Sequence, residues 1–176
     1  MKRNYPVKKK LSFRENIQII IPLIYDDFMS YKDRVVNHPR LKHELHRMRI
    51  TGKPLRYAME YAVPVFGEDF KECLSEVKNI IELMGEIHDA DVLIPELHTH
   101  LKEIRRYNRT LANREERLTT NGILKLIRET KEKRKTMFDE LCATIIKWLN
   151  EGFRTRIIAS MEVPTYNLTL VKPRAM

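Results

Sequence analysis

The sequence has few of the residues that mark secreted or membrane-embedded proteins. Two of its 176 residues are cysteine, and both fall in amphipathic, helix-like segments, so we expect reduced thiols packed as small hydrophobic side chains. No apolar run is long enough to cross a bilayer, and the basic start MKRNYPVKKK lacks the apolar stretch of a secretory signal. We therefore expect a cytoplasmic protein with no membrane partner.

Glycine is also scarce, with five residues, and the sequence has no glycine-rich loop of the kind that binds nucleotide phosphates. It shows neither strand–helix alternation nor an internal repeat with the period of a solenoid. No serine, cysteine or threonine stands beside a base in a recognisable nucleophilic arrangement, and the close Glu–His pairs have the wrong spacing for a di-iron bundle. These absences predict a protein that is not an enzyme and that holds neither a cofactor nor a metal.

Positive charge, by contrast, is abundant. The chain contains 33 Lys and Arg residues against 24 Asp and Glu, which gives a net charge of +9 at pH 7. This balance indicates an acidic partner such as nucleic acid, an anionic lipid surface or polyphosphate. Residues 1–10 carry five positive charges and no negative one, so we expect residues 1–12 to form a flexible basic arm.

Hydrophobic residues recur every three to four positions, which predicts an all-α bundle of four main, long and partly kinked helices. The helices are expected at 13–35, at 39–63, at 68–93 with an extension over 96–118, and at 120–158. Pro22, Pro54 and Pro95 predict kinks or interruptions. We expect residues 13–160 to form one helical domain and residues 161–176 a tail without a clear helix.

Two segments depart from this simple amphipathic pattern. Residues 128–136, RETKEKRKT, are almost wholly charged or polar, and they are expected either to project beyond the bundle or to line a wet surface. Residues 41–63, LKHELHRMRITGKPLRYAMEYAV, carry a basic row that consists of His46, Arg49, Lys53 and Arg56, with Lys42 one turn earlier. At about 100° per residue, the four main members share an arc of roughly 80°, separate from the apolar arc.

The length and composition of this basic row indicate its ligand. The four main residues span roughly 15 Å at about 1.5 Å per residue, which suits an extended polyanion better than one small anion. Glu60 is the one carboxylate in the row, at its far end. Taken singly, such basic residues are typical of a solvated face that pairs with Glu residues of a neighbouring helix. Taken together, they lack the interleaved acids of such a face and favour an anion site.

The same segment resembles a known family. Residues 46–57, HRMRITGKPLRY, resemble the signature helix of the CHAD family, the conserved histidine α-helical domains. Residues 78–89, KNIIELMGEIHD, resemble the family's second motif, in which Leu83-x-Gly85 is followed four residues later by Asp89. Pro54 departs from the family, which usually has a basic or polar residue there. The resemblance covers roughly residues 13–158 and implies an all-helical fold that binds inorganic polyphosphate through basic residues.

We therefore interpret the basic row as a polyphosphate site that is completed by a lysine of the next helix. The predicted binding residues are Lys42, His46, Arg49, Lys53, Arg56 and Lys78. We expect His46 to donate a hydrogen bond to a phosphate, Gly85 to allow close approach of helices or ligand, and Asp89 to orient an arginine of the site.

The number of motif copies bears on assembly. The family usually carries two similar helical halves per chain, whereas this sequence has one copy of each motif and resembles a single-half version. One half leaves its basic groove open to water, which weakens each charged contact, and two chains related by a two-fold axis would enclose it. We expect a homodimer that polyphosphate favours.

Two other functions stay open. Charge alone does not separate polyphosphate from nucleic acid, so a nucleic-acid-binding helical domain is the first alternative, although no helix-turn-helix or RNA-binding signature supports it. The less favoured alternative is a metal-dependent phosphohydrolase, because His88-Asp89 resembles the His-Asp pair of such enzymes. His46 and Asp139 would have to complete that site, and the nearby Lys and Arg residues oppose binding of a divalent cation.

Overall fold

The computed structural model describes residues 5–162, and every regular element in that range is helical. The elements are α1 (Phe13–Met29), α2 (Lys32–Val35), α3 (Lys42–Ala62), a 3-10 turn η1 (Val63–Val65), α4 (Glu68–Thr110), α5 (Asn121–Asn150) and α6 (Phe153–Ser160). The predicted all-α bundle is confirmed, with α1, α3, α4 and α5 as its main helices. The expectations for residues 1–4 and 163–176 lie outside the described residues.

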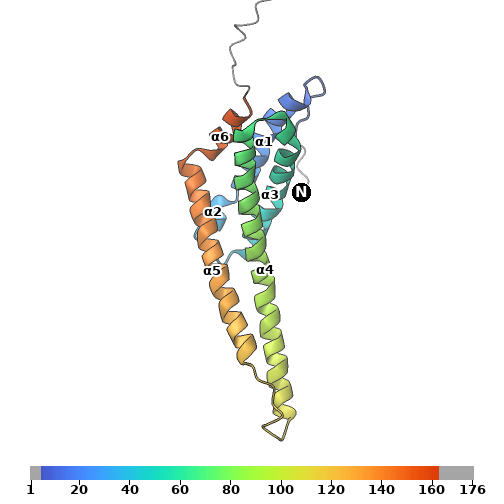
Figure 1. The fold of residues 1–176 in the computed structure, drawn as a ribbon, viewed down its shortest axis with the longest axis vertical. Coiled ribbons are helices and arrows are strands. Elements are labelled where there is room, and N and C mark those ends of the chain that lie inside the picture. Colours follow the sequence, from blue (N-terminus) through green and yellow to red (C-terminus); the bar gives the residue numbers. More distant parts are fainter. Residues whose placement is uncertain (1–4, 163–176) are drawn as a thin grey trace, which may run out of the picture.

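The molecule is elongated because α4 and α5 run on beyond the bundle as a two-helix hairpin (Figure 1). The main hydrophobic core draws on α1, α3, α6, the first half of α4 and the second half of α5. A smaller cluster of Leu97, Leu101 and Ile127 lies farther along the hairpin. Residues 128–136 lie between these two cores without a buried side chain, and Arg134 among them contacts Asp91 and the carbonyl oxygen of Pro39, so the segment begins the hairpin beside the bundle.

Helix α1 begins where the side chain of Ser12 accepts a hydrogen bond from the backbone of Glu15 and the Glu15 carboxylate accepts one in return. The prediction of one helix over 13–35 is wrong, because α1 ends at Met29 and the separate turn α2 follows. At this break, the hydroxyl of Ser30 donates to the carbonyl oxygen of Asp27 over 2.7 Å. Such local bonds compete with continuation of a helix.

Residues 5–12, the described part of the predicted basic arm, lie against α1. The Tyr5 hydroxyl donates to Asp27 over 2.8 Å. The buried Asn16 side chain accepts from the backbone of Lys8 over 2.8 Å and donates to the carbonyl oxygen of the same residue over 3.1 Å. This part of the arm therefore has defined contacts with the bundle.

Helix α3 crosses between α1 and α4, and Gly52 sits at the crossing. A Cβ atom built at Gly52 would lie 2.9 Å from the Phe28 ring and 3.2 Å from Ile81, so only glycine permits this approach of the three helices. The helix begins at Lys42 rather than at the predicted position 39, and it continues through Pro54.

Helix α4 is one element of 43 residues, so of the kink or restart predicted at Pro95 the restart is wrong. Leu97 and Leu101 pack against Ile127 directly after the proline, and this packing holds α4 on its course beside α5. The predicted helix over 120–158 is interrupted at Gly152, whose φ of 64° is left-handed and ends α5. Helix α6 then folds back onto the bundle, where Phe153 stacks on Trp148.

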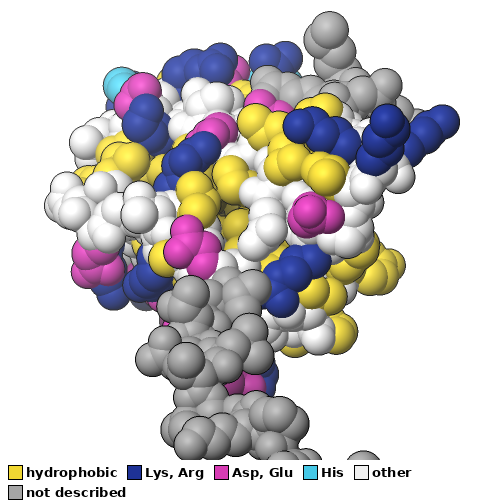
Figure 2. Space-filling model, turned by 90° about the horizontal axis from the view of Figure 1, so that it is seen from above, with side chains coloured by type: hydrophobic (Ala, Val, Ile, Leu, Met, Phe, Trp, Pro, Cys, Tyr) yellow, Lys and Arg dark blue, Asp and Glu magenta, His cyan; other side chains and the backbone are white. Residues whose placement is uncertain are grey.

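The end of the bundle opposite the hairpin has a mixed surface. Figure 2 shows Lys and Arg side chains there among Asp, Glu and hydrophobic ones. Specific pairs account for part of this mixture, since Arg154 of α6 forms two hydrogen bonds to Asp26 of α1 at 2.7 and 2.8 Å. The charge at this end is therefore interleaved, as on an ordinary solvated surface.

Candidate functional site

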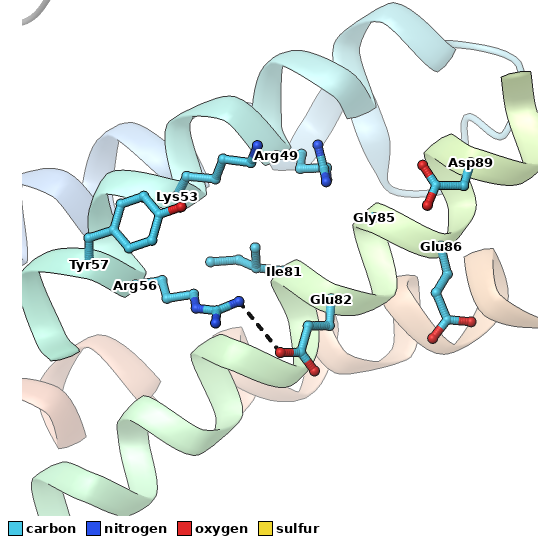
Figure 3. A pocket seen from close by; sticks show the side chains of 9 residues that line it. All are labelled: Arg49, Lys53, Arg56, Tyr57, Ile81, Glu82, Gly85, Glu86 and Asp89. Atoms are coloured by element: carbon cyan, nitrogen blue, oxygen red, sulfur yellow. Dashed lines mark hydrogen bonds and ion pairs between the residues drawn. The ribbon is translucent and has the colours of Figure 1, made fainter.

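A cleft of about 340 Å³ opens between α3 and α4 (Figure 3). Helix α3 contributes Arg49, Lys53, Arg56 and Tyr57 to its walls, and α4 contributes Ile81, Glu82, Gly85, Glu86 and Asp89. The cleft therefore brings together three of the six predicted binding residues and both predicted supporting residues. It lies where the two motifs found in the sequence face each other.

Arg49 lies over Gly85 in the middle of the cleft. A Cβ atom at Gly85 would come within 3.4 Å of Nη2 and 3.5 Å of Nε of Arg49, so the glycine leaves room for the guanidinium group. Within residues 5–162, the Nε atom of Arg49 is buried and has no hydrogen-bond partner. Because an unpaired buried donor costs about 1–3 kcal/mol, such an atom indicates that a ligand supplies the acceptor.

Lys53 lies beside Arg49 on the same wall, and its side chain extends toward Arg49 (Figure 3). Among the described residues, no side chain forms a hydrogen bond or an ion pair with Lys53. Two neighbouring cations without a counter-ion repel each other, and a bound anion would relieve this repulsion.

The other end of the basic row is already paired. The Nε atom of Arg56 lies 3.1 Å from Oε1 of Glu60, its Nη1 atom lies 3.4 Å from Glu82, and Lys78 Nζ lies 3.0 Å from the same Glu60 oxygen. Hydrogen bonds from Lys78 and Arg56 hold the pKa of Glu60 below its usual value, against the opposing effect of burial. Lys78 does not line the cleft, so this part is an ion-pair network of the kind that solvated faces form.

Lys42 is also engaged outside the cleft. Its Nζ atom lies 2.7 Å from Oδ1 of Asp91, and Arg134 of α5 holds both oxygens of the same carboxylate at 2.9 and 3.1 Å. Burial acts to raise the pKa of Asp91, but hydrogen bonds from Arg134 and Lys42 outweigh it and keep that pKa below its usual value. This triad ties α3, α4 and α5 together.

His46 lies in an adjoining hollow of about 260 Å³, and its ring stacks on that of His88 with centroids 4.9 Å apart. Burial lowers the pKa of His46, and the charges of His88 and Arg49 lower it further. The Nδ1 atom of His46 is buried and has no hydrogen-bond partner in the described part of the chain. His46 is therefore protonated less readily than a free histidine, and its buried Nδ1 atom lies beside the cleft.

The carboxylates of α4 point in different directions. Glu86 turns away from α3 toward α5, where Lys133 Nζ lies 3.0 Å from it (Figure 3). Asp89 lines the cleft, but its side chain is 80% exposed and lies 3.4 Å from Nδ1 of His88. Among the described residues Asp89 thus contacts His88 and no arginine, and its expected role in orienting an arginine stays a prediction.

No role in the anion site was predicted for His88, Tyr57 or Glu82. His88 follows Gly85 by three residues, so helical periodicity already placed it on the side of α4 that faces α3. Glu82 precedes Gly85 by three residues and shares that side for the same reason. The opposing acids of α4 could thus have been inferred once the two motifs were paired.

Within residues 5–162, no group of three or more His, Cys, Asp or Glu side chains is placed to hold a metal ion. No helix in the described part combines the length and hydrophobicity needed to cross a membrane.

The fold and the cleft define an all-α domain with a basic row on one helix facing a glycine-containing motif on the next. Residues 22–98 match the family model of the CHAD domain, a segment that includes all of α3 and both walls of the cleft. This match supports the resemblance of the segment to the CHAD family. No curated protein and no solved structure matches the chain. The outer part of the hairpin lies beyond the matched residues.

Proposed function

We propose that this protein binds inorganic polyphosphate in the cleft between α3 and α4, without catalysis. The observation that carries the proposal is the pair of unsatisfied cations there: the Nε atom of Arg49 is buried without an acceptor, and Lys53 lacks a counter-ion among the described residues. Arginine suits phosphate because its planar guanidinium binds two oxygens at once, and lysine adds a mobile point charge. The family of the matched segment supports the same ligand.

The contacts to the ligand are not equivalent. Arg49 and Lys53 supply the primary contacts, because neither has a partner to release in the described part of the chain. Arg56 would have to exchange Glu60 and Glu82 for phosphate, so its net contribution is smaller. His46 supplies a hydrogen bond from the edge of the cleft. Binding would release counter-ions from the phosphate chain, so the affinity should fall steeply with salt.

A calorimetric titration of the full chain tests the proposal. Long-chain polyphosphate, duplex DNA and single-stranded RNA are titrated into the wild type and into Lys53→Glu at two salt concentrations. We expect polyphosphate to bind more tightly than either nucleic acid and Lys53→Glu to bind it at least about tenfold more weakly, because one charged contact becomes a repulsive one. The matched control is Lys147→Glu, which makes the same charge change at an exposed position on α5.

The competing functions predict different results in this titration. Tighter binding of DNA or RNA would favour the nucleic-acid-binding alternative, and equal effects of Lys53→Glu and Lys147→Glu would place the site elsewhere. Incubation with magnesium or manganese tests catalysis, because a binder leaves the length of the polyphosphate unchanged. Shortened chains would favour the phosphohydrolase alternative.

We also propose that two copies associate through the hairpin, as the single-half sequence suggests. A groove of about 740 Å³ adjoins the cleft and shares Glu86 and Asp89 with it, and its apolar lining includes Leu93 and Leu126, which are 39% and 44% exposed. Two such hairpins side by side would form a four-helix arrangement that covers these leucines. Sedimentation at increasing protein concentration, with and without polyphosphate, tests this; Leu126→Glu should abolish the association, and a monomer under all conditions would exclude it.

A further inference from the structure

The far end of the hairpin has an excess of positive charge that the cleft does not explain. We call residues 102–120 the hairpin tip. They contain six cations and three carboxylates: Lys102, Arg105, Arg106, Arg109, Arg114 and Arg117 against Glu103, Glu115 and Glu116. All six cations are exposed, and none of them forms an ion pair with another described residue. The family match ends at residue 98, so nothing in it accounts for this surface.

Helical spacing gathers four of these cations on one side of α4. Lys102, Arg105, Arg106 and Arg109 follow the spacing i, i+3, i+4 and i+7, which confines them to an arc of about 100°. Leu101 lies outside this arc and packs toward α5, so the four cations flank the side that holds the hairpin together. Glu103 falls outside the arc as well, and it pairs with His100 at 3.1 Å.

The tip is a built structure rather than a loose loop. The Asn108 side chain donates to the carbonyl oxygen of Leu118 over 2.8 Å and accepts from its backbone N–H over 2.9 Å. Arg117 donates to the carbonyl oxygen of Leu111 over 3.4 Å. These bonds close the chain between α4 and α5, so the cations are displayed together at the end of a two-helix arm.

We infer that the hairpin tip is a second contact for the same phosphate chain, so that long polyphosphate binds across cleft and tip together. This inference rests on the function proposed for the cleft. The chemistry of both places is alike, since unpaired arginines and lysines bind phosphate oxygens without reading a sequence. The tip adds a second contact that lies far from the cleft along α4.

The distance between the two places sets a length requirement for the ligand. Gly85, in the cleft, and Arg106, in the tip, are 21 positions apart on one continuous helix, which corresponds to about 32 Å at 1.5 Å per residue. Tripolyphosphate is far too short to span this distance, whereas a long chain is not. Two linked contacts raise affinity by effective concentration, but only when the linker reaches both.

The test compares two ligands on three variants of the full chain. Tripolyphosphate and long-chain polyphosphate are titrated into Lys53→Glu, into the tip variant Arg105→Gln/Arg106→Gln/Arg109→Gln, and into a control with the same net charge as the tip variant, Lys10→Gln/Lys71→Gln/Lys147→Gln. We expect the tip variant to bind tripolyphosphate like the wild type and the long chain at least about tenfold more weakly. The control should lose little with either ligand.

The outcomes separate this inference from the function on which it rests. If the tip variant binds the long chain like the control, the second contact does not exist, while the cleft remains a polyphosphate site. If Lys53→Glu binds both ligands like the wild type, the proposed function of the cleft fails. Duplex DNA and RNA are titrated into the same variants as a further comparison, and a tip variant that loses affinity for them but not for long polyphosphate would overturn the inference.

Discussion

The cleft and the hairpin tip are both basic, but they hold their charge in opposite ways. The cleft sets three cations against three carboxylates, and its unsatisfied groups are few and partly buried. The tip sets six cations against three carboxylates, and its cations are exposed. Water and salt screen a contact between exposed charges strongly. A contact that satisfies a buried, unpaired donor contributes more to the binding free energy.

The difference shows that a count of charges does not locate a binding site. By count, the cleft is neutral and the tip is the obvious anion surface. By geometry, the cleft but not the tip combines a glycine-made space, a buried Nε atom of Arg49 and a lysine, Lys53, that has no partner within residues 5–162. We therefore expect each contact in the cleft to contribute more to affinity than a contact at the tip. We expect the tip to make binding depend on the length of the polyphosphate and on salt.

Neutralising the cleft should have the largest effect. We expect Arg49→Gln/Lys53→Gln to weaken binding of polyphosphate at least about hundredfold, because two charge-assisted contacts of about 1.5–3 kcal/mol each are lost. Calorimetry measures the change, and circular dichroism checks that the helical content is kept. The matched control, Lys71→Gln/Lys147→Gln, removes the same charge at exposed positions, and an equal loss in it would mean that only net charge matters.

Two glycines allow the geometry of the cleft to be tested apart from its charge. At Gly52 an added Cβ would meet the Phe28 ring at 2.9 Å, so Gly52→Ala should lower the free energy of unfolding by about 1–3 kcal/mol. At Gly85 the nearest atom is the movable end of Arg49 at 3.4 Å, so Gly85→Ala should raise that free energy by up to about 1 kcal/mol through helix propensity. Urea unfolding measures both.

The variants Gly52→Ala and Gly85→Ala also distinguish effects on helix packing from effects on polyphosphate binding. Gly85→Ala should weaken polyphosphate binding severalfold despite its added stability, because the methyl group occupies the space next to the Arg49 guanidinium. Unchanged binding in Gly85→Ala would show that this space is not part of the site. A Gly52→Ala protein as stable as the wild type would contradict the close helix crossing.

The salt dependence of the binding constant should also distinguish the tip from the cleft, with a smaller effect than the substitutions above. Each phosphate contact adds about 0.7–0.9 to the slope of log K against log salt, on the scale established for nucleic acids. Removing three tip arginines should therefore reduce the slope for long-chain polyphosphate by about 2–3, while the slope for tripolyphosphate stays the same. Titrations at four salt concentrations give both slopes, and parallel lines for the two proteins with the long chain would contradict a role for the tip.

The sequence predicted the all-α class and the faces of α3 because both follow from periodicity within one helix. Periodicity within one helix does not show what lies opposite, so the ion pairs that join α3 to α4, Lys42 with Asp91 and Lys78 with Glu60, were not predicted. The ends of the helices were harder to predict from the sequence. The left-handed turn at Gly152 and the continuation of α4 through Pro95 both depend on packing with other elements. That Arg49 and Lys53 have no partner within residues 5–162 depends on where the side chains of the neighbouring helices lie, which the periodicity of one helix does not show.

The smallest effect concerns pH and the His46–His88 stack. Burial and the charges of His88 and Arg49 lower the pKa of free His46 below its usual 6.5, whereas a bound phosphate chain favours the charged ring and raises that pKa. Binding therefore takes up a proton, and the affinity for polyphosphate should rise a few-fold as pH falls from about 8 to about 6.

Stability without ligand should change in the opposite sense. His46 binds a proton more readily in the unfolded chain than in the folded one. Its contribution to the free energy of unfolding is therefore present above the unfolded pKa of about 6.5. This contribution is lost as the pH falls from there through the lower pKa of the folded state. His46→Asn should flatten both trends, which calorimetry in two buffers of different ionisation enthalpy and thermal unfolding across the same range would measure. If His46→Asn keeps the proton uptake of the wild type, the titrating group is another one, and His88, stacked against His46, is the residue to replace next.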